Sequence, residues 1–362
     1  MLIYNVFLIV NVLIGLVVLY SPFVKEKYRD NLYLFISFIM LTLLGGLRSI
    51  NVGTDTKAYL DIFYLIKYTN NFKELFKLNY EIGFILLNKI IAIWGGNGQT
   101  FLFVTSAIIS FGFIYFIKKN SINPLLSVFL LITLYYYYAS FNGIRQYIAI
   151  VILLNSFTFF KNKNFLAFIS FILLASLFHL TAIFFLPLYI LGITYWEYKR
   201  VILLLIILFL IYINLESLVL LLIKILPQYK SYLGSSYLQG YTGKMYLVVN
   251  LTIFFFILVV YVAKRGYKDP FTNMLIIIDI LICTLTIFAT KVHFANRISW
   301  YLTQFHIILI PHFLNLIDEN KIRKIALILI IIMGICYHSY SLSVNLHKVS
   351  PYVFYWDYRL NV

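Results

Sequence analysis

The chain has 362 residues, of which 62% are hydrophobic and only 12% are charged, and its formal net charge is +16. A mean hydropathy of +0.92 excludes the two soluble domains that the length alone would allow. The basic residues are scattered among short segments between apolar runs, so the positive charge indicates cytoplasmic loops of a membrane protein rather than nucleic-acid binding.

The apolar runs begin with Leu2–Tyr20, which carries no charge and has about the 20 residues that a bilayer-spanning helix needs. No basic segment precedes this run and no small-residue cleavage pattern follows it, so we expect a retained transmembrane helix rather than a signal peptide. Further apolar runs follow at Leu32–Leu47, Ile82–Trp94, Phe101–Ile117, Leu125–Ala139, Tyr147–Phe160, Phe165–Phe178, Thr181–Tyr195, Val201–Leu226, Met245–Ala263, Phe271–Thr290, Ile298–Ile317 and Ile325–Tyr337. The pattern predicts an all-α, polytopic integral membrane protein with about ten to twelve transmembrane helices, including short or re-entrant segments, in one domain over residues 1–362.

Basic residues predict the orientation of the chain. No Lys or Arg precedes the first run, whereas residues 25–29 contain three, which places the N-terminus outside the cytoplasm. The other basic clusters are also cytoplasmic if Ile82–Trp94 does not cross fully and if the chain turns back near His179. Three longer segments are then external and are candidates to cap an outward-facing cavity: 48–80, 227–244 and 339–362.

Four further features have mainly structural interpretations. Cys283 and Cys336 lie in apolar runs without metal-ligand spacing, so we expect buried thiols. The Tyr135–Tyr138 run is typical of an interfacial aromatic belt, with carbohydrate stacking as the alternative. Asp279 lies within an apolar run, and we expect it to pair with a basic group on another helix. Gly95–Gly98 lacks the Lys-Ser/Thr of a phosphate loop, so we expect a turn there, and without an HExxH motif or a Cys/His cluster we expect no metal site.

The sequence RSINVGTDTKAY, residues 48–59, is the first candidate for chemistry. Arg48 offers planar, paired donors that suit phosphate oxygens. Thr54, Asp55 and Thr56 fit two alternatives, namely the cap of a following helix or, together with Tyr59, a substrate-binding loop.

Glu81 and His179 are the next ionisable residues beside apolar runs. A glutamate in the first turn of a helix is favoured by the helix dipole, and the alternative is an acid, a base or a ligand for sugar hydroxyls. His179 has apolar residues on both sides, so it is either a structurally satisfied histidine or a group that transfers protons.

Two arginines are candidates for phosphate binding. Asn142 and the glycine after it predict a break, which places Arg145 and Gln146 in the first turn of a helix. A cation is unfavourable there unless an anion is bound, which favours an anion site over an Arg that extends to the interface. Arg297 and Tyr301 are four residues apart and are expected on one helix face, as substrate contacts or interface anchors.

These motifs, in the order Arg48 with GTDTKAY, YEIGF, FNGIRQYIA, FHLTA and NRISWY, resemble the EpsG family of polysaccharide-biosynthesis membrane proteins. That family groups with Wzy-type O-antigen and capsule repeat-unit polymerases, and the resemblance covers roughly Tyr4–Tyr301. It implies a glycosyltransferase at the outer face of the bacterial cytoplasmic (inner) membrane. The growing chain would move from its undecaprenyl diphosphate carrier to the next lipid-linked oligosaccharide unit. Implied partners are that substrate, membrane lipid, and a flippase and a chain-length regulator of the same pathway.

The resemblance also implies roles for single residues. Arg145 and Arg297 would hold the diphosphate, and His179, or else Asp55 or Glu81, would take the proton of the acceptor hydroxyl. An arginine clamp can replace a metal ion, so the transfer is expected to be metal-independent and without a cofactor.

Two other functions are alternatives. A membrane-bound O-acyltransferase also uses a histidine among apolar helices, but it does not explain Arg48 and the GTDT loop. A flippase or transporter for lipid-linked oligosaccharide often has repeated halves, and the sequence has no convincing internal repeat.

Overall fold

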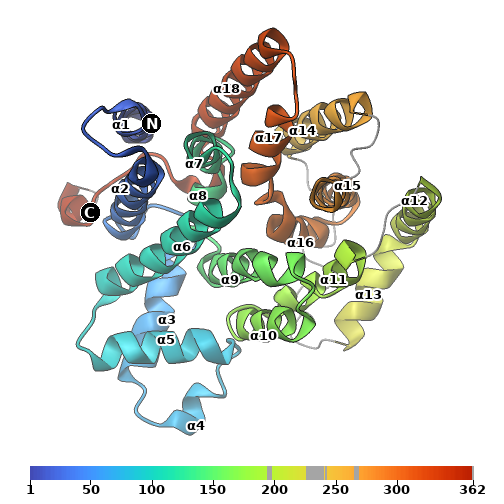
Figure 1. Ribbon diagram of the computed structural model, residues 1–362. Helices are drawn as coiled ribbons and strands as arrows, with labels where there is room; N and C mark the ends of the chain where they lie inside the picture. Colours follow the sequence, from blue (N-terminus) through green and yellow to red (C-terminus); the bar gives the residue numbers. More distant parts are fainter. Residues whose placement is uncertain (194–197, 226–239, 241–242, 265–268, 361–362) are drawn as a thin grey trace.

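The computed structural model describes residues 1–360 apart from 194–197, 226–239, 241–242 and 265–268. The described residues form helices and contain no strand beyond one isolated bridge between Arg48 and Phe354 (Figure 1). The all-α prediction is therefore confirmed. The expected external segment 227–244 lies almost entirely outside the described residues.

Six described helices are long and apolar enough to cross a membrane, and a seventh crossing is possible where α12 and α13 meet at a bend of 73°. The expected ten to twelve crossings also counted apolar runs that here form shorter helices. The six long helices are α1 (Leu2–Tyr20), α6 (Gly98–Asn120), α9 (Ile144–Lys161), α14 (Lys244–Ala263), α15 (Pro270–Lys291) and α18 (Asn320–Ser343).

Shorter or more polar helices complete the fold, and some of them, such as α4 and α12, lie at its edge (Figure 1). α5 has only 12 residues, as expected for a run that does not cross fully. The remaining elements are α2 (Glu26–Gly46), α3 (Thr56–Tyr68), α4 (Phe72–Leu75), α5 (Ile82–Ile93), α7 (Pro124–Thr133), α8 (Tyr136–Ala139), α10 (Phe165–Ser176), η1 (Leu180–Phe185), α11 (Pro187–Ile193), α12 (Tyr198–Ile213), α13 (Leu215–Ile225), α16 (His293–Thr303), α17 (His306–Asn315), η4 (Leu346–Lys348) and η5 (Tyr355–Leu360).

The chain turns back at His179, as the topology requires. α10 ends at Ser176, and η1 and α11 return beside it, because the Tyr189 hydroxyl donates to the Lys163 carbonyl oxygen (2.7 Å). The Tyr189 ring also lies 5.0 Å from the ring of Phe165 at the start of α10. A 12-residue helix is about 18 Å long, well short of a bilayer core of about 30 Å. Residues 165–193 therefore form a re-entrant hairpin with His179 at its tip.

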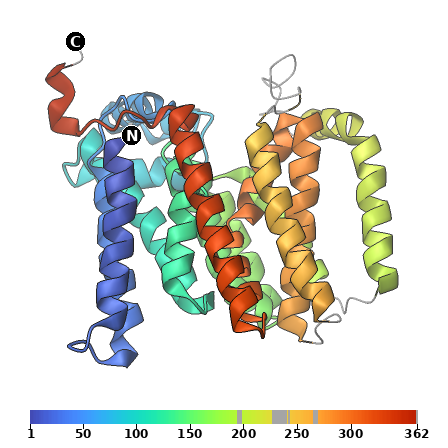
Figure 2. The ribbon, with the colours of Figure 1, turned by 90° about the horizontal axis from the view of Figure 1, so that it is seen from above.

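Different contacts mark the two ends of the bundle. At one end, Lys161 Nζ donates to Asn120 Oδ1 (2.8 Å) and Lys264 pairs with Asp318. At the other end, the N-terminal ammonium donates to Ser350 Oγ (3.1 Å), and both termini lie there (Figure 2).

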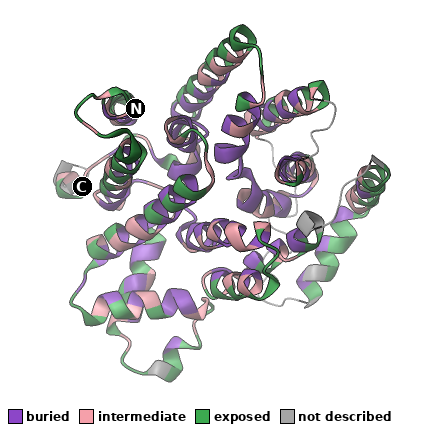
Figure 3. Cartoon of the chain, viewed as in Figure 1, coloured by how far each residue is buried: buried purple, intermediate pink, exposed green. Residues whose placement is uncertain are grey.

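The buried residues are concentrated on α8, α9, α16 and α17 at the centre of the bundle (Figure 3). The interfacial interpretation of Tyr135–Tyr138 is wrong, since all four residues are buried. Tyr135 has a left-handed backbone (φ 69°). This conformation follows the end of α7 and changes the direction of the chain, so that the run lies in the protein interior. Asp279 has its expected basic partner, His306, at 3.4 Å. Cys283 is buried as predicted, whereas Cys336 is exposed, because α18 packs against the bundle along only part of its surface.

Candidate active site

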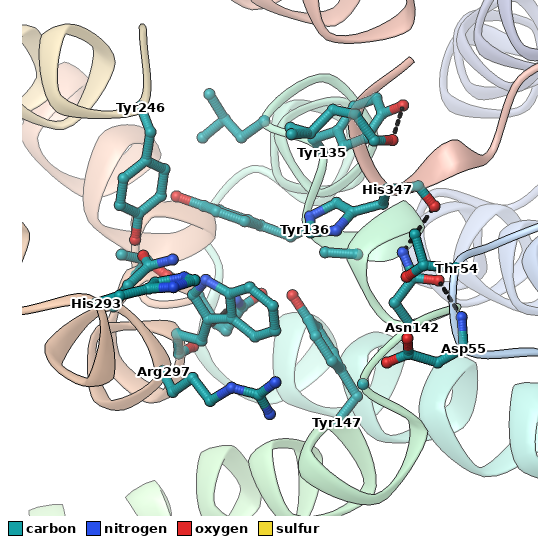
Figure 4. A pocket seen from close by; sticks show the side chains of 18 of the residues that line it. Thr54, Asp55, Tyr135, Tyr136, Asn142, Tyr147, Tyr246, His293, Arg297 and His347 are labelled. Atoms are coloured by element: carbon teal, nitrogen blue, oxygen red, sulfur yellow. Dashed lines mark hydrogen bonds between the residues drawn. The ribbon is translucent and has the colours of Figure 1, made fainter. Parts of the chain in front are cut away.

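A polar cavity of about 330 Å³ lies at the end of the bundle that holds the termini (Figure 4). The lining contains the carboxylate of Asp55 and the guanidinium of Arg297. Aromatic side chains form much of the rest of the wall. The lining residues are Thr54, Asp55, Leu134, Tyr135, Tyr136, Ala139, Asn142, Gly143, Tyr147, Tyr246, His293, Asn296, Arg297, Trp300, Thr303, Gln304, Tyr337, Leu346 and His347.

The loop before α3 directs Asp55 to this cavity. Asp55 occupies the N-cap position of α3, but its side chain makes no capping hydrogen bond, so the capping interpretation is wrong for this side chain. Its carboxylate forms no hydrogen bond or ion pair with a described residue. Gly53 has a φ of 102°, and a Cβ there would lie 2.7 Å from Asn142 Oδ1. The tight loop therefore needs glycine, and it leaves the Asp55 carboxylate available to a ligand.

Asn142 joins this loop to the C-terminal segment. Its Oδ1 accepts from the Asp55 backbone N–H (3.4 Å), and its Nδ2 donates to the His347 carbonyl oxygen (2.8 Å). His347 (φ 64°) and Tyr135 (φ 69°) both have left-handed backbones, and their rings stack with centroids 6.3 Å apart. Such conformations cost about 1–3 kcal/mol each and concentrate at functional sites. Burial lowers the pKa of His347 to about 4, so its ring is neutral at physiological pH.

α9 and α16 supply the opposite wall. α9 begins at Ile144 with Gly143 as its N-cap, so Arg145 and Gln146 lie in the first turn as predicted. Gln146 Nε2 donates to the backbone carbonyl of Arg297 (2.6 Å) and fixes α16 against α9. Arg297 lines the cavity, whereas Tyr301 does not. The Tyr301 hydroxyl instead bonds to Thr181 Oγ1 in η1 (2.9 Å), which makes it a contact between α16 and the re-entrant hairpin.

A second group of ionisable residues surrounds Glu81 at the start of α5. Glu81 Oε2 accepts a hydrogen bond from Arg145 Nη1. Glu81 Oε1 lies 3.2 Å from His179 Nδ1 and accepts from the Leu180 N–H (3.3 Å). Arg145 also lies over the Tyr80 ring, 4.9 Å from its centroid. Glu81 therefore ties α5 to α9 and to the tip of the hairpin, and the helix dipole alone does not account for its position.

The surroundings of Glu81 and His179 determine their protonation. Burial opposes ionisation of Glu81, but the hydrogen bond with His179 and the charge of Arg145 outweigh it and lower the pKa of Glu81 to about 2. Burial lowers the pKa of His179 below 6.5, and the contact with Glu81 opposes this change only in part. At neutral pH the network therefore assigns a proton to Nδ1, which donates to Glu81, and none to Nε2. His179 Nε2 is buried and has no hydrogen-bond partner among the described residues.

The sequence-predicted residues thus fall into three sets. Thr54, Asp55, Asn142 and Arg297 line the polar cavity, and the cluster of Glu81, Arg145 and His179 does not. The third set contains five buried residues that do not line the cavity, namely Arg48, Thr56, Tyr59, Gln146 and Tyr301.

The four residues in this last set other than Tyr301 have packing or hydrogen-bonding roles. Arg48 Nη1 donates to the Gly45 carbonyl and to Ser106 Oγ (3.3 Å), which joins the end of α2 to α6. Thr56 Oγ1 donates to a carbonyl within its own loop (2.6 Å). Tyr59 packs edge-on against Phe84, next to Arg145.

Several lining residues were not predicted. His293, Asn296 and Trp300 share the face of Arg297 by the helical spacing of α16, so a search for polar and aromatic residues at 3.6-residue intervals could have found them. The apolar run that begins at Ile298 obscured this pattern. His347 is far from the other motifs in sequence, and no local signal places it in the cavity. Among the described residues, no group of three or more His, Cys, Asp or Glu side chains is arranged to hold a metal ion.

Comparison with known proteins gives one match. The model of the family described as the EpsG family matches residues 31–354, nearly the whole chain. No curated protein and no solved structure matches the chain.

Proposed function

Because this chain belongs to the EpsG family of Wzy-type polymerases, we propose that it joins oligosaccharide repeat units carried on undecaprenyl diphosphate. Family membership supports a general role in polysaccharide polymerisation. The long apolar helices indicate a multi-pass membrane protein. The specific substrate, the residues and the outward orientation are part of the proposal.

The observation that carries the proposal is the composition of the polar cavity. It combines a guanidinium, several aromatic rings and a carboxylate that forms no hydrogen bond or ion pair within the described part of the chain. Aromatic faces suit the apolar faces of sugar rings, while polar side chains suit sugar hydroxyls. A cavity of about 330 Å³ is within the range of small-molecule sites.

The proposed reaction is a direct displacement at the anomeric carbon of the growing chain. An acceptor hydroxyl oxygen forms the new bond to this carbon as the bond to the diphosphate oxygen breaks. Asp55 takes the proton of the acceptor hydroxyl, and the diphosphate leaves with both electrons of the broken bond and remains on its lipid carrier. Arg297 offsets the negative charge that grows on the leaving group, so metal ions are not required.

His179 is the second candidate for the base. Its unprotonated Nε2 and its Nδ1 contact with Glu81 resemble the arrangement in which a carboxylate orients a catalytic histidine. Asp55 is preferred because its side chain lines the cavity, whereas His179 is buried and does not line it. Arg297 lines the cavity and Arg145 does not, so we assign the leaving group to Arg297, and we assign Arg145, which pairs with Glu81, to positioning the hairpin.

Basic segments support an outward-facing cavity. The cavity lies at the end of the bundle opposite Lys161 and Lys264, and Lys and Arg are enriched on the cytoplasmic side of membranes. This position supports our proposal that the transfer takes place at the outer face of the cytoplasmic membrane.

Reconstitution tests the proposal. The purified protein in liposomes, given its lipid-linked repeat unit, should produce a ladder of longer lipid-linked chains, including in the presence of EDTA. Arg297→Ala removes a charged hydrogen bond worth about 1.5–3 kcal/mol and should slow extension by roughly ten- to a hundredfold. Arg323→Ala, at the opposite end of the bundle, is the matched control. Movement of single units across the membrane without longer products would instead support a transporter.

A further inference from the structure

α16 separates two cavities of opposite character. Arg297 and Trp300 on one face of the helix line the polar cavity. Phe294, Ile298 and Leu302 on the other face line a second cavity of about 410 Å³. Because polar and apolar residues alternate with helical spacing along 11 residues, α16 presents a polar surface on one side and an apolar surface on the other.

The second cavity offers few polar groups to a ligand. Its lining is hydrocarbon or aromatic apart from Thr284 and Tyr301. The Thr284 hydroxyl donates to the Ile280 carbonyl oxygen (2.8 Å), and the Tyr301 hydroxyl is bonded to Thr181 (2.9 Å). A polar ligand would lose its hydrogen bonds to water without replacement, so this cavity suits an apolar chain.

The position of the second cavity suits a ligand that comes from the bilayer. α12 forms its outer wall and is a peripheral helix, with large hydrophobic residues exposed along its length (Figure 2). α13 bends away from α12 by 73° and also lines the cavity. Lys291 Nζ donates to the Ile213 carbonyl oxygen (3.1 Å), which fixes this bend at the end of α15 that leads into α16.

We propose that the second cavity binds the isoprenoid chain of the lipid carrier while its diphosphate lies at Arg297. This inference rests on the proposed function. One amphiphile would contact both faces of α16, with its anionic head and glycan in the polar cavity and its branched apolar chain in the other. A phospholipid shares an anionic head and apolar chains, but it has no glycan to occupy an aromatic-lined polar cavity.

Photochemical cross-linking tests the site without relying on polymerisation. The wild-type protein in nanodiscs is irradiated with a polyprenyl diphosphate that carries a diazirine on its chain, and the labelled peptides are mapped. We expect adducts on α13, α15 or α16, and we expect competition by an unlabelled polyprenyl diphosphate that carries a glycan but not by phosphatidylglycerol. Adducts spread over the lipid-facing surfaces of α1 and α18, or equal competition by both lipids, would overturn the inference.

Chain length provides a second test. Thr284→Trp fills the cavity, and Ile287→Trp, on an exposed position of the same helix outside the cavity, is its control. Thr284→Trp should raise the KM for a long-chain substrate about tenfold, which is equivalent to ~1.4 kcal/mol of binding free energy. A loss of this size is expected if about two methylene groups of the chain can no longer be buried. The KM for a short-chain analogue should change much less, and Ile287→Trp should change neither value. Equal KM changes for both chain lengths would overturn the inference.

The two tests also separate this inference from the proposed function. If the wild-type protein extends neither substrate, the proposed function fails, and the cross-linked positions alone decide whether the lipid site exists.

Discussion

Replacing Asp55 by Asn tests the proposed base with little disturbance of the fold. The substitution keeps the shape of the side chain, and the Asp55 carboxylate has no hydrogen bond to a described residue that could be lost. The backbone bond from the Tyr59 N–H to the Asp55 carbonyl oxygen (3.0 Å) is unaffected. We therefore expect the free energy of unfolding to change by no more than about 0.5 kcal/mol.

The expected loss of activity is much larger. A positioned general base contributes about 10²–10⁴ in rate, which is about 2.7–5.4 kcal/mol of transition-state stabilisation. The assay is the initial rate of chain extension in proteoliposomes, with the Tm of the purified protein measured in parallel. Asp61→Asn makes the same charge change at an exposed position of α3 and should keep the wild-type rate.

A rate for Asp55→Asn within about threefold of wild type would refute the assignment, because no general base contributes so little. His179→Gln would then be the decisive variant, since glutamine can accept the hydrogen bond of a hydroxyl but cannot take its proton.

Three other predictions concern stability, the loop and the topology. The pKa of Glu81 is lowered from 4.5 to about 2, so its ionised form stabilises the fold fully above about pH 4.5, and this stabilisation is lost as the pH falls towards 2. Between about pH 5 and pH 3 the Tm should therefore fall more for wild type than for Glu81→Gln, and equal slopes would contradict the ion pair. Gly53→Ala and Gly95→Ala both place alanine at a positive φ, but only Gly53→Ala meets a neighbouring amide and should slow extension; equal rates would show that the loop tolerates a Cβ. In a cysteine-free background, Lys57→Cys should react with an impermeant thiol reagent in intact cells and Lys321→Cys should not, and the reverse pattern would invert the topology.

Much of the architecture followed from the sequence because bilayer crossing depends on local properties. The length and apolarity of a run predict a helix such as α1 or α6 whatever its neighbours are. The break before Arg145 and the turn at His179 were also predictable. The first has an Asn-Gly signal, and the second was required to keep the basic loops on one side.

The composition of the cavity was decided by tertiary structure. Asp55, Arg297 and His347 are separated by long stretches of sequence, and only the packing of the helices brings their side chains to one cavity. Likewise, no local signal links Glu81 to Arg145, because a glutamate at a helix start and an arginine in a first turn each have a separate local interpretation.

The placement of Tyr301 shows the limit of helical spacing. A separation of four residues puts Tyr301 near Arg297 around α16, but its ring extends towards the re-entrant hairpin and its hydroxyl bonds to Thr181. The sequence by itself determined the all-α class and the long apolar helices, since helix formation and apolarity depend on each segment's own residues. Tertiary structure alone decided which polar side chains face one another, since that depends on contacts between segments far apart in the chain.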